Sequence, residues 1–176
     1  MLTSLGRKPH DESLLGLLGA CHQRIRSFAR QALTTAQSSE ASDAERIASC
    51  QSVARYFREA LPLHVQDEHE SIAPRIRTRS AEVRAAVDRM ELEHHEHLPE
   101  LSALLQALED LARLPSREAN RSELASCAAR MIDAFEAHLV HEETVLFPAI
   151  ALLDASVQDE IIRELRGRRQ RFPAVE

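Results

Sequence analysis

The sequence predicts an all-α protein: an antiparallel up-down-up-down four-helix bundle followed by a short C-terminal fifth helix. The four glycines (Gly6, Gly16, Gly19 and Gly167) lie near the two ends of the chain, while the long middle stretch is rich in Ala, Leu, Glu, Arg and Gln. These residues favour helices. In the first and third of the expected helices, apolar residues recur at three and four positions and do not alternate with a period of two, which is the pattern of amphipathic helices.

Polar breaks and capping residues divide the chain into the expected helices. The segment TTAQSSEAS reads as a loop after the first helix, LPSREAN precedes the fourth, and a cap signal at Asp154–Ser156 precedes the fifth. The expected helices run from about Glu12 to Leu33, Asp43 to Ile76, Ala81 to Leu114, Arg121 to Leu153 and Val157 to Arg169. Residues 1–176 are expected to form a single domain, with a bundle core at about 12–153 and the last helix at about 156–170.

Two prolines fall inside these helices. Pro62 lies in the second helix and Pro99 in the third. Proline lacks a backbone donor and clashes with the preceding turn. We therefore expect each to kink or divide its helix.

Composition excludes several classes of protein. With 22 basic and 28 acidic side chains the net charge is −6, so nucleic acid is not an expected partner. The Arg-rich stretch Arg163–Arg171 can contact an anionic partner, but such a stretch is more often a solvated face. No segment has the roughly 18 uninterrupted apolar residues of a membrane span. The cysteines Cys21, Cys50 and Cys127 are odd in number and lack CxxC spacing, which disfavours disulfides and thiolate zinc sites. A cytoplasmic location is expected by elimination.

An internal repeat carries the chemistry. The segments HVQDEHESIAP, from His64, and HLVHEETVLFP, from His138, share a His, a Glu four residues later and a Pro six residues beyond that. Four residues along a helix advance about 6 Å and turn about 40° beyond a full revolution, so the His and Glu point the same way. One such pair can be a solvated surface pair, whereas two matched copies beside apolar stripes favour an inward site.

The first and third helices each add a histidine on the apolar stripe. His22 lies in line with Leu15, Leu18 and Ile25, and His94 lies in line with apolar residues of the third helix that include Met90 and Leu98. A single inward histidine is more often a hydrogen-bonded core residue. Four inward histidines with two inward glutamates would be costly to bury without a partner. A pair of metal ions neutralises them, and imidazole with carboxylate suits iron, manganese or zinc.

These residues make the sequence resemble the hemerythrin-like family in its bacterial, HHE cation-binding form. The ending at Glu143, Phe147 and Pro148 also looks like the fourth-helix signature of that group, and the resemblance covers about residues 12–153. It implies two iron ions, with manganese or zinc as alternatives. It further implies that the metal ligands are His22 and His64 on one ion, His94 and His138 on the other, and bridging Glu68 and Glu142.

The sequence departs from the oxygen-carrying members at two places. They have a second histidine four residues after the first on the third helix, where this chain has Leu98, and their fourth helix carries His-x4-Asp. His141, His97 or Asp67 could supply an additional ligand. His69, His95 and His10 are expected on the surface. These departures put reversible oxygen carriage in doubt, but not metal binding.

The function expected from these residues is a non-haem di-iron protein that senses, stores or reversibly binds a small ligand such as O2, NO or peroxide. A di-iron enzyme of the oxidase or peroxide-consuming type is the alternative, and a metal-free helical interaction module is the third possibility. Ferritin-like enzymes use paired Glu-x-x-His motifs, which the repeat does not match. Whether the protein is an enzyme, and its oligomeric state, stay open. No HExxH, phosphate-binding glycine loop or nucleophile elbow is present.

Overall fold

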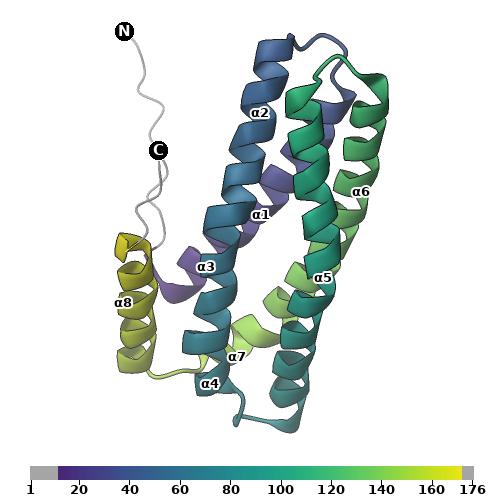
Figure 1. The fold of residues 1–176 in the computed structure, drawn as a ribbon. Coiled ribbons are helices and arrows are strands. Elements are labelled where there is room, and N and C mark those ends of the chain that lie inside the picture. Colours follow the sequence, from purple (N-terminus) through teal and green to yellow (C-terminus); the bar gives the residue numbers. More distant parts are fainter. Residues whose placement is uncertain (1–11, 172–176) are drawn as a thin grey trace, which may run out of the picture.

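The computed structural model describes residues 12–171, which form an antiparallel four-helix bundle with one additional helix and no strand in that range (Figure 1). The second and fourth bundle helices are built from consecutive α-helical and π-helical pieces. The elements are α1 (Leu14–Gln37), α2 (Asp43–Arg55), η1 (Tyr56–Ala60), α3 (Leu61–Gln66), η2 (Asp67–Ile72), α4 (Ala73–Ile76), α5 (Ala81–Arg113), α6 (Glu118–His141), η3 (Glu142–Leu146), α7 (Phe147–Ala151) and α8 (Ala155–Arg171).

The first helix is longer than the sequence predicted. It continues to Gln37, through residues that were expected to form a loop. The Thr35 hydroxyl donates to the Gln31 carbonyl at 2.8 Å and lies 2.6 Å from the Ser49 hydroxyl of α2. Thr35 and Ala36 are buried. Packing against α2 therefore extends the helix beyond what its composition favours.

Each π-helical turn ends two residues before a proline. Pro62, Pro74 and Pro148 are the second residues of α3, α4 and α7, which follow η1, η2 and η3. A π turn places one extra residue in the helix, which is one way to accommodate a missing donor and the bulk of the proline ring. The expected division at Pro62 is confirmed in this form, and the helix as a whole keeps its direction. Pro99 lies inside α5, which continues through it without a break.

The inward residues of α5 repeat with spacings of four and three. They are Val83, Val87, Met90, His94, His97, Leu101, Leu104, Leu108 and Leu111, all of them buried or half-buried. A 4-3 repeat averages 3.5 residues per turn and keeps one seam of the helix facing its partners. Leu98 is off this seam and is 58% exposed, so its expected place on the apolar stripe is wrong, and His97 holds the inward position.

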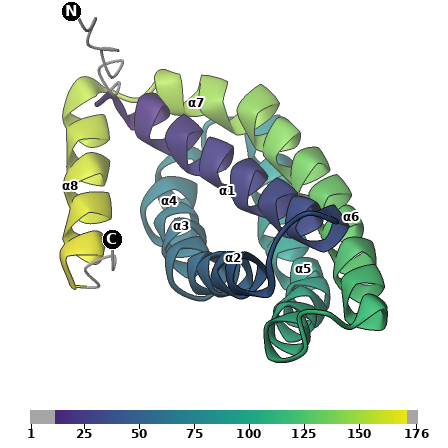
Figure 2. The ribbon, with the colours of Figure 1, turned by 90° about the horizontal axis from the view of Figure 1, so that it is seen from above.

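The four bundle helices surround a common axis (Figure 2). α1 packs against α2 and α6, and α5 packs against the same two neighbours. The buried apolar residues form two clusters at opposite ends of the bundle. On the first three bundle helices the polar residues of the predicted site lie between the parts that belong to these two clusters. On the fourth, Glu142 does so, and His138 borders the first cluster beside Leu139. The fold thus encloses a polar layer between two apolar cores.

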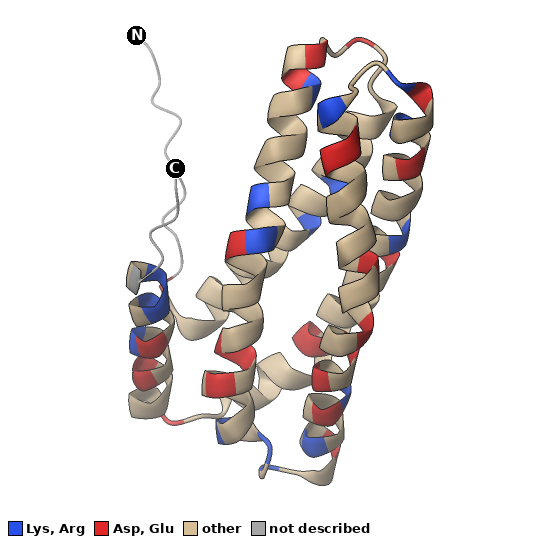
Figure 3. Ribbon diagram, viewed as in Figure 1, with Lys and Arg blue, Asp and Glu red and all other residues tan. Residues whose placement is uncertain are grey.

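The last helix, α8, packs outside the bundle against η2 and α1. Its buried residues Ile161 and Leu165 join the apolar cluster formed by Leu14 and Leu18. Charges of both signs lie along it (Figure 3). Within the described range, no helix is both long enough and apolar enough to cross a membrane.

Candidate metal centre

Five of the six residues predicted as ligands are fully buried by the four-helix fold, and the sixth, His94, is nearly so. His22 is 0% exposed, Glu142 is 1%, His64 and His138 are each 3%, and Glu68 is 4%. They come from α1, α3, η2, α5, α6 and η3. The two glutamates stand at the first or second residue of a π turn. Such turns occur often at functional sites because they redirect side chains locally.

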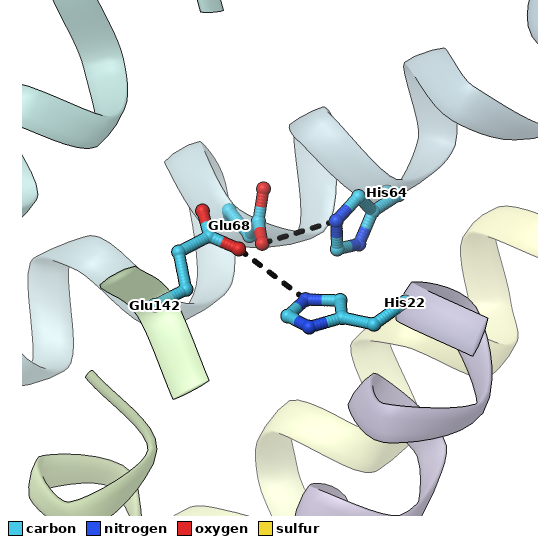
Figure 4. A group of neighbouring side chains, drawn as sticks. All are labelled: His22, His64, Glu68 and Glu142. Atoms are coloured by element: carbon cyan, nitrogen blue, oxygen red, sulfur yellow. Dashed lines mark ion pairs between the residues drawn. The ribbon is translucent and has the colours of Figure 1, made fainter. Parts of the chain in front are cut away.

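One group of side chains consists of His22, His64, Glu68 and Glu142 (Figure 4). One potential ligand atom from each lies within 4.8 Å of the others. The Nε2 atom of His22 is 3.3 Å from Glu142 Oε2, and Nε2 of His64 is 3.2 Å from Glu68 Oε1. The two imidazole rings meet edge to face, with their centroids 5.3 Å apart.

A second group consists of His94, His138 and Glu142. The Nε2 atom of His138 is 3.1 Å from Glu142 Oε1 and 3.1 Å from Nε2 of His94. His94 Nε2 also lies 3.3 Å from Glu68 Oε2. Each glutamate therefore presents one oxygen to a histidine of the first group and the other oxygen to a histidine of the second.

Three of the histidines are held from behind by a second side chain. His22 Nδ1 lies 2.9 Å from Glu143 Oε1, and His138 Nδ1 lies 2.8 Å from Glu93 Oε2. His94 Nδ1 lies 2.8 Å from His69 Nε2. A hydrogen bond at Nδ1 fixes the ring and directs Nε2 towards the centre, which is the usual support of a metal-binding histidine.

The supporting glutamates are themselves anchored by arginines. Arg26 donates to both oxygens of Glu143, at 2.7 and 3.1 Å, and also to Glu136 at 2.9 Å. Arg89 donates to Glu93 at 2.6 Å. Burial acts to raise the pKa of Glu143, but the hydrogen bonds from Arg26 and His22 outweigh this effect and lower the pKa overall. Glu143 therefore stays ionised beside His22.

Burial shifts the pKa of most groups at the centre. It lowers the pKa of His64 and of His94 to about 3 and raises that of Glu68 well above its ordinary value, with the charge of Glu142 adding to the last effect. Burial also acts to raise the pKa of Glu142, but the close approach of the His138 and His22 imidazoles to its carboxylate lowers the pKa overall. The lowered pKa values of His64 and His94 favour neutral imidazole rings, the form that binds a metal ion.

Several buried polar atoms of these residues lack a hydrogen-bond partner in the described part of the chain. They are Nε2 of His22, both ring nitrogens of His64, Oε2 of Glu68 and both carboxylate oxygens of Glu142. Unpaired buried polar atoms are costly, and such a group calls for an explanation. Nitrogen and oxygen donors converging on one buried point can hold metal ions, and this donor set suits iron, manganese or zinc.

The three additional candidates from the sequence lie outside both groups. His97 packs its ring against those of His138 and Phe135, with centroid distances of 5.2 and 5.7 Å. His141 is half-buried, and its Nε2 has no hydrogen-bond partner among the described residues. Asp67 is turned towards α8, where it pairs with Arg168 and Arg169 at 2.8 and 2.7 Å. The structure gives no support to Asp67 as a ligand.

The sequence prediction missed the role of the supporting side chains. His69 was expected on the surface, but it is half-buried and stacked on His94 with ring centroids 5.0 Å apart. Its position within η2, directly after Glu68, turns it towards α5. His95 is exposed as expected, and His10 lies outside the described residues. Among the supporting residues, only Glu143 was singled out in the sequence, through the fourth-helix signature that it forms with Phe147 and Pro148.

Comparison with known proteins gives two matches. A family model described as the hemerythrin HHE cation binding domain matches residues 13–150, and again residues 99–173. An uncharacterized protein of Haemophilus influenzae is 26% identical over 163 residues, covering 88% of each chain. The family match spans the whole set of histidines and glutamates described above.

Proposed function

The chain belongs to the hemerythrin HHE cation-binding family, and on that premise we propose that it is a non-haem di-iron protein that reversibly binds, stores or senses a small ligand such as O2, NO or peroxide. In this proposal His22 and His64 hold one ion, His94 and His138 hold the other, and Glu68 and Glu142 bridge the two. Iron bound in this way would supply a redox-active Lewis acid. Manganese and zinc are the alternative metals.

The observation that carries the proposal is the placement of the two buried glutamates. Glu142 places Oε2 at 3.3 Å from His22 and Oε1 at 3.1 Å from His138. Glu68 likewise places its two oxygens at 3.2 and 3.3 Å from His64 and His94. Carboxylates that face two pairs of imidazoles are suited to bridging two cations rather than holding one. Four histidines and two glutamates also give each ion a mixed nitrogen and oxygen environment.

The direct test is the metal content of protein purified without a histidine tag. We expect two metal ions per chain, and we expect the double variant His64→Ala with His138→Ala to lose both. His95→Ala is the matched control, because His95 is exposed and its ring contacts only the Glu91 carbonyl among the bonds that the structure shows. Retention of two ions in the double variant would contradict the assignment.

A second measurement separates reversible binding from turnover. The absorption spectrum of the reduced, iron-loaded protein should change on exposure to air or NO and should recover when the ligand is removed. Catalytic consumption of added peroxide, at many equivalents per chain, would instead identify a di-iron enzyme. An iron-loaded protein that shows neither response would leave metal binding intact and contradict the small-ligand part of the proposal.

A further inference from the structure

A cavity of about 220 Å³ lies between α3, α5 and α6, against the second histidine group. Its inner wall includes His94, His138 and the buried Leu139. Its outer wall includes Pro62 and Leu98, which are exposed. The cavity therefore connects the surface of the bundle with the histidine layer.

The side chains around the cavity are apolar apart from imidazoles. Six of the apolar ones are Ile25, Leu61, Val65, Leu101, Phe135 and Leu139. Among the described residues that line the cavity there is no Lys, Arg, Asp or Glu. The polar groups are the rings of His64, His94, His97 and His138. The last three lie together, because the His138 ring centroid is 4.8 Å from that of His94 and 5.2 Å from that of His97. A pocket with one polar wall and otherwise apolar walls selects an uncharged ligand with a single polar end.

The cavity is large enough for a ligand much bigger than a diatomic molecule. An apolar cavity of about 150 Å³ binds benzene. The cavity here is larger, at about 220 Å³. It can hold one aromatic ring with a short substituent, or a short hydrocarbon chain of similar volume.

Two consecutive residues of α5, His97 and Leu98, contribute different parts of the cavity wall. The 4-3 repeat directs His97 inward, where its ring stands against His138 and Phe135. Leu98 is displaced to the rim and is 58% exposed. Leu98 therefore stands at the entrance of the cavity rather than in its interior.

We propose that this cavity is a binding site for a small, uncharged, mainly apolar organic molecule, whose polar end faces His94 and His138. This inference goes beyond the proposed function and rests on it only for the metal ions that would lie beside the polar end of the molecule. The apolar walls, the volume and the opening at Leu98 do not depend on a bound metal. The ligand would enter from the side of the bundle between α3 and α5.

The test uses phenol and toluene as probes, with methyl NMR of zinc-reconstituted protein as the readout. Both probes should shift the methyl signals of Val65, Leu101 and Leu139. Phenol should bind more tightly because its hydroxyl can hydrogen-bond to the imidazole of His97, which lines the cavity and lies outside both groups of potential ligands. Leu101 is a half-buried residue of the cavity wall, and Leu101→Phe should fill part of the cavity. It should weaken the binding of both probes at least about tenfold. Leu98→Trp, at the exposed rim, should also weaken them and carries little risk for folding.

The control is Leu92→Trp, because Leu92 lies on the same helix, is equally 58% exposed, and does not line the cavity. It should bind both probes as the unchanged protein does. Absence of methyl shifts, or affinities that neither cavity variant alters, would overturn the site. Toluene binding as tightly as phenol would overturn the orientation. Zinc content measured on the same samples keeps the two proposals separate, since a protein without zinc that binds toluene contradicts only the metal assignment.

Discussion

Asp67 and Glu68 are consecutive residues of η2, yet their carboxylates point in different directions, one towards α8 and the other towards the histidines inside the bundle. Glu68 faces the histidine layer, within 3.3 Å of His94, whereas Asp67 faces α8 and pairs with Arg168 and Arg169. Both glutamate and aspartate are buried. The last helix thus neutralises the charge directly behind a proposed metal ligand.

Removing both arginines should leave Asp67 buried without a partner. Arg168→Ala with Arg169→Ala is expected to lower the free energy of unfolding by about 3–5 kcal/mol, the usual cost of breaking a buried pair from one side. Chemical denaturation measures this change. Arg166→Ala is the control, since its pair with Glu12 is exposed and should contribute less than about 1 kcal/mol. Adding Asp67→Asn to the double variant should restore part of the loss; an equal loss with and without it would contradict this account.

Metal removal should make stability depend on pH through Glu68. Burial, with the neighbouring Glu142, raises its folded pKa well above the ordinary value, so its contribution is fully present below that ordinary value and is lost as pH rises through the folded pKa. In metal-free protein, Glu68→Gln should therefore increase stability at pH 8, by on the order of 1–3 kcal/mol, and change it little at pH 4. Thermal melting of chelator-treated samples measures this. If the Glu68→Gln variant is less stable than the unchanged protein at pH 8, burial of the Glu68 carboxylate does not destabilise the metal-free fold.

The histidines should oppose this trend at acid pH. Burial lowers the pKa of His64 and of His94 to about 3, so their contribution is present above the ordinary histidine value near 6.5 and is lost as pH falls towards 3. Metal-free protein should thus lose stability as pH falls below about 6, and zinc should restore it at neutral pH. The metal-free Glu68→Gln variant lacks the opposing contribution of Glu68, and melting curves of this variant that are identical between pH 4 and 7 would contradict the burial of these rings.

His69 should act on metal binding through His94. Replacing it with Phe keeps a ring beside His94 but removes the nitrogen that lies 2.8 Å from His94 Nδ1. Loss of such support usually weakens metal binding about 10–100-fold. Competition with a chromophoric chelator measures the affinity. The control is His95→Phe, because His95 directly follows His94 in α5 but is exposed. Equal affinities in the two variants would assign His69 a packing role only.

Neither His97 nor His141 should be required for metal binding. Both stand outside the two groups of potential ligand atoms that the described residues form. His97→Ala and His141→Ala are each expected to retain two ions per chain, and His97→Ala should bind toluene more tightly because it enlarges the cavity. Loss of one ion in either variant would identify that residue as the additional ligand that the sequence left open.

The sequence by itself determined the helical class, the positions of the helices to within a few residues, and the six side chains that meet at the centre. The reason is that helical periodicity is local: His64 and Glu68, four residues apart, share a face whatever surrounds them. The repeat of this spacing at His138 and Glu142 was visible in the same way. The family resemblance, confirmed by the match to residues 13–150, rests on those local spacings.

Only the tertiary structure decided which neighbours support the centre. The hydrogen bond of His69 with His94 joins residues 25 positions apart, and that of Glu143 with His22 joins residues 121 apart, so no local spacing could indicate them. The π turns at η2 and η3 and the 4-3 repeat of α5 rotate side chains by fractions of a turn relative to an ideal helix. These small rotations accumulate along a helix, and for that reason packing alone placed His97 inward, moved Leu98 to the rim of a cavity and turned Asp67 towards α8.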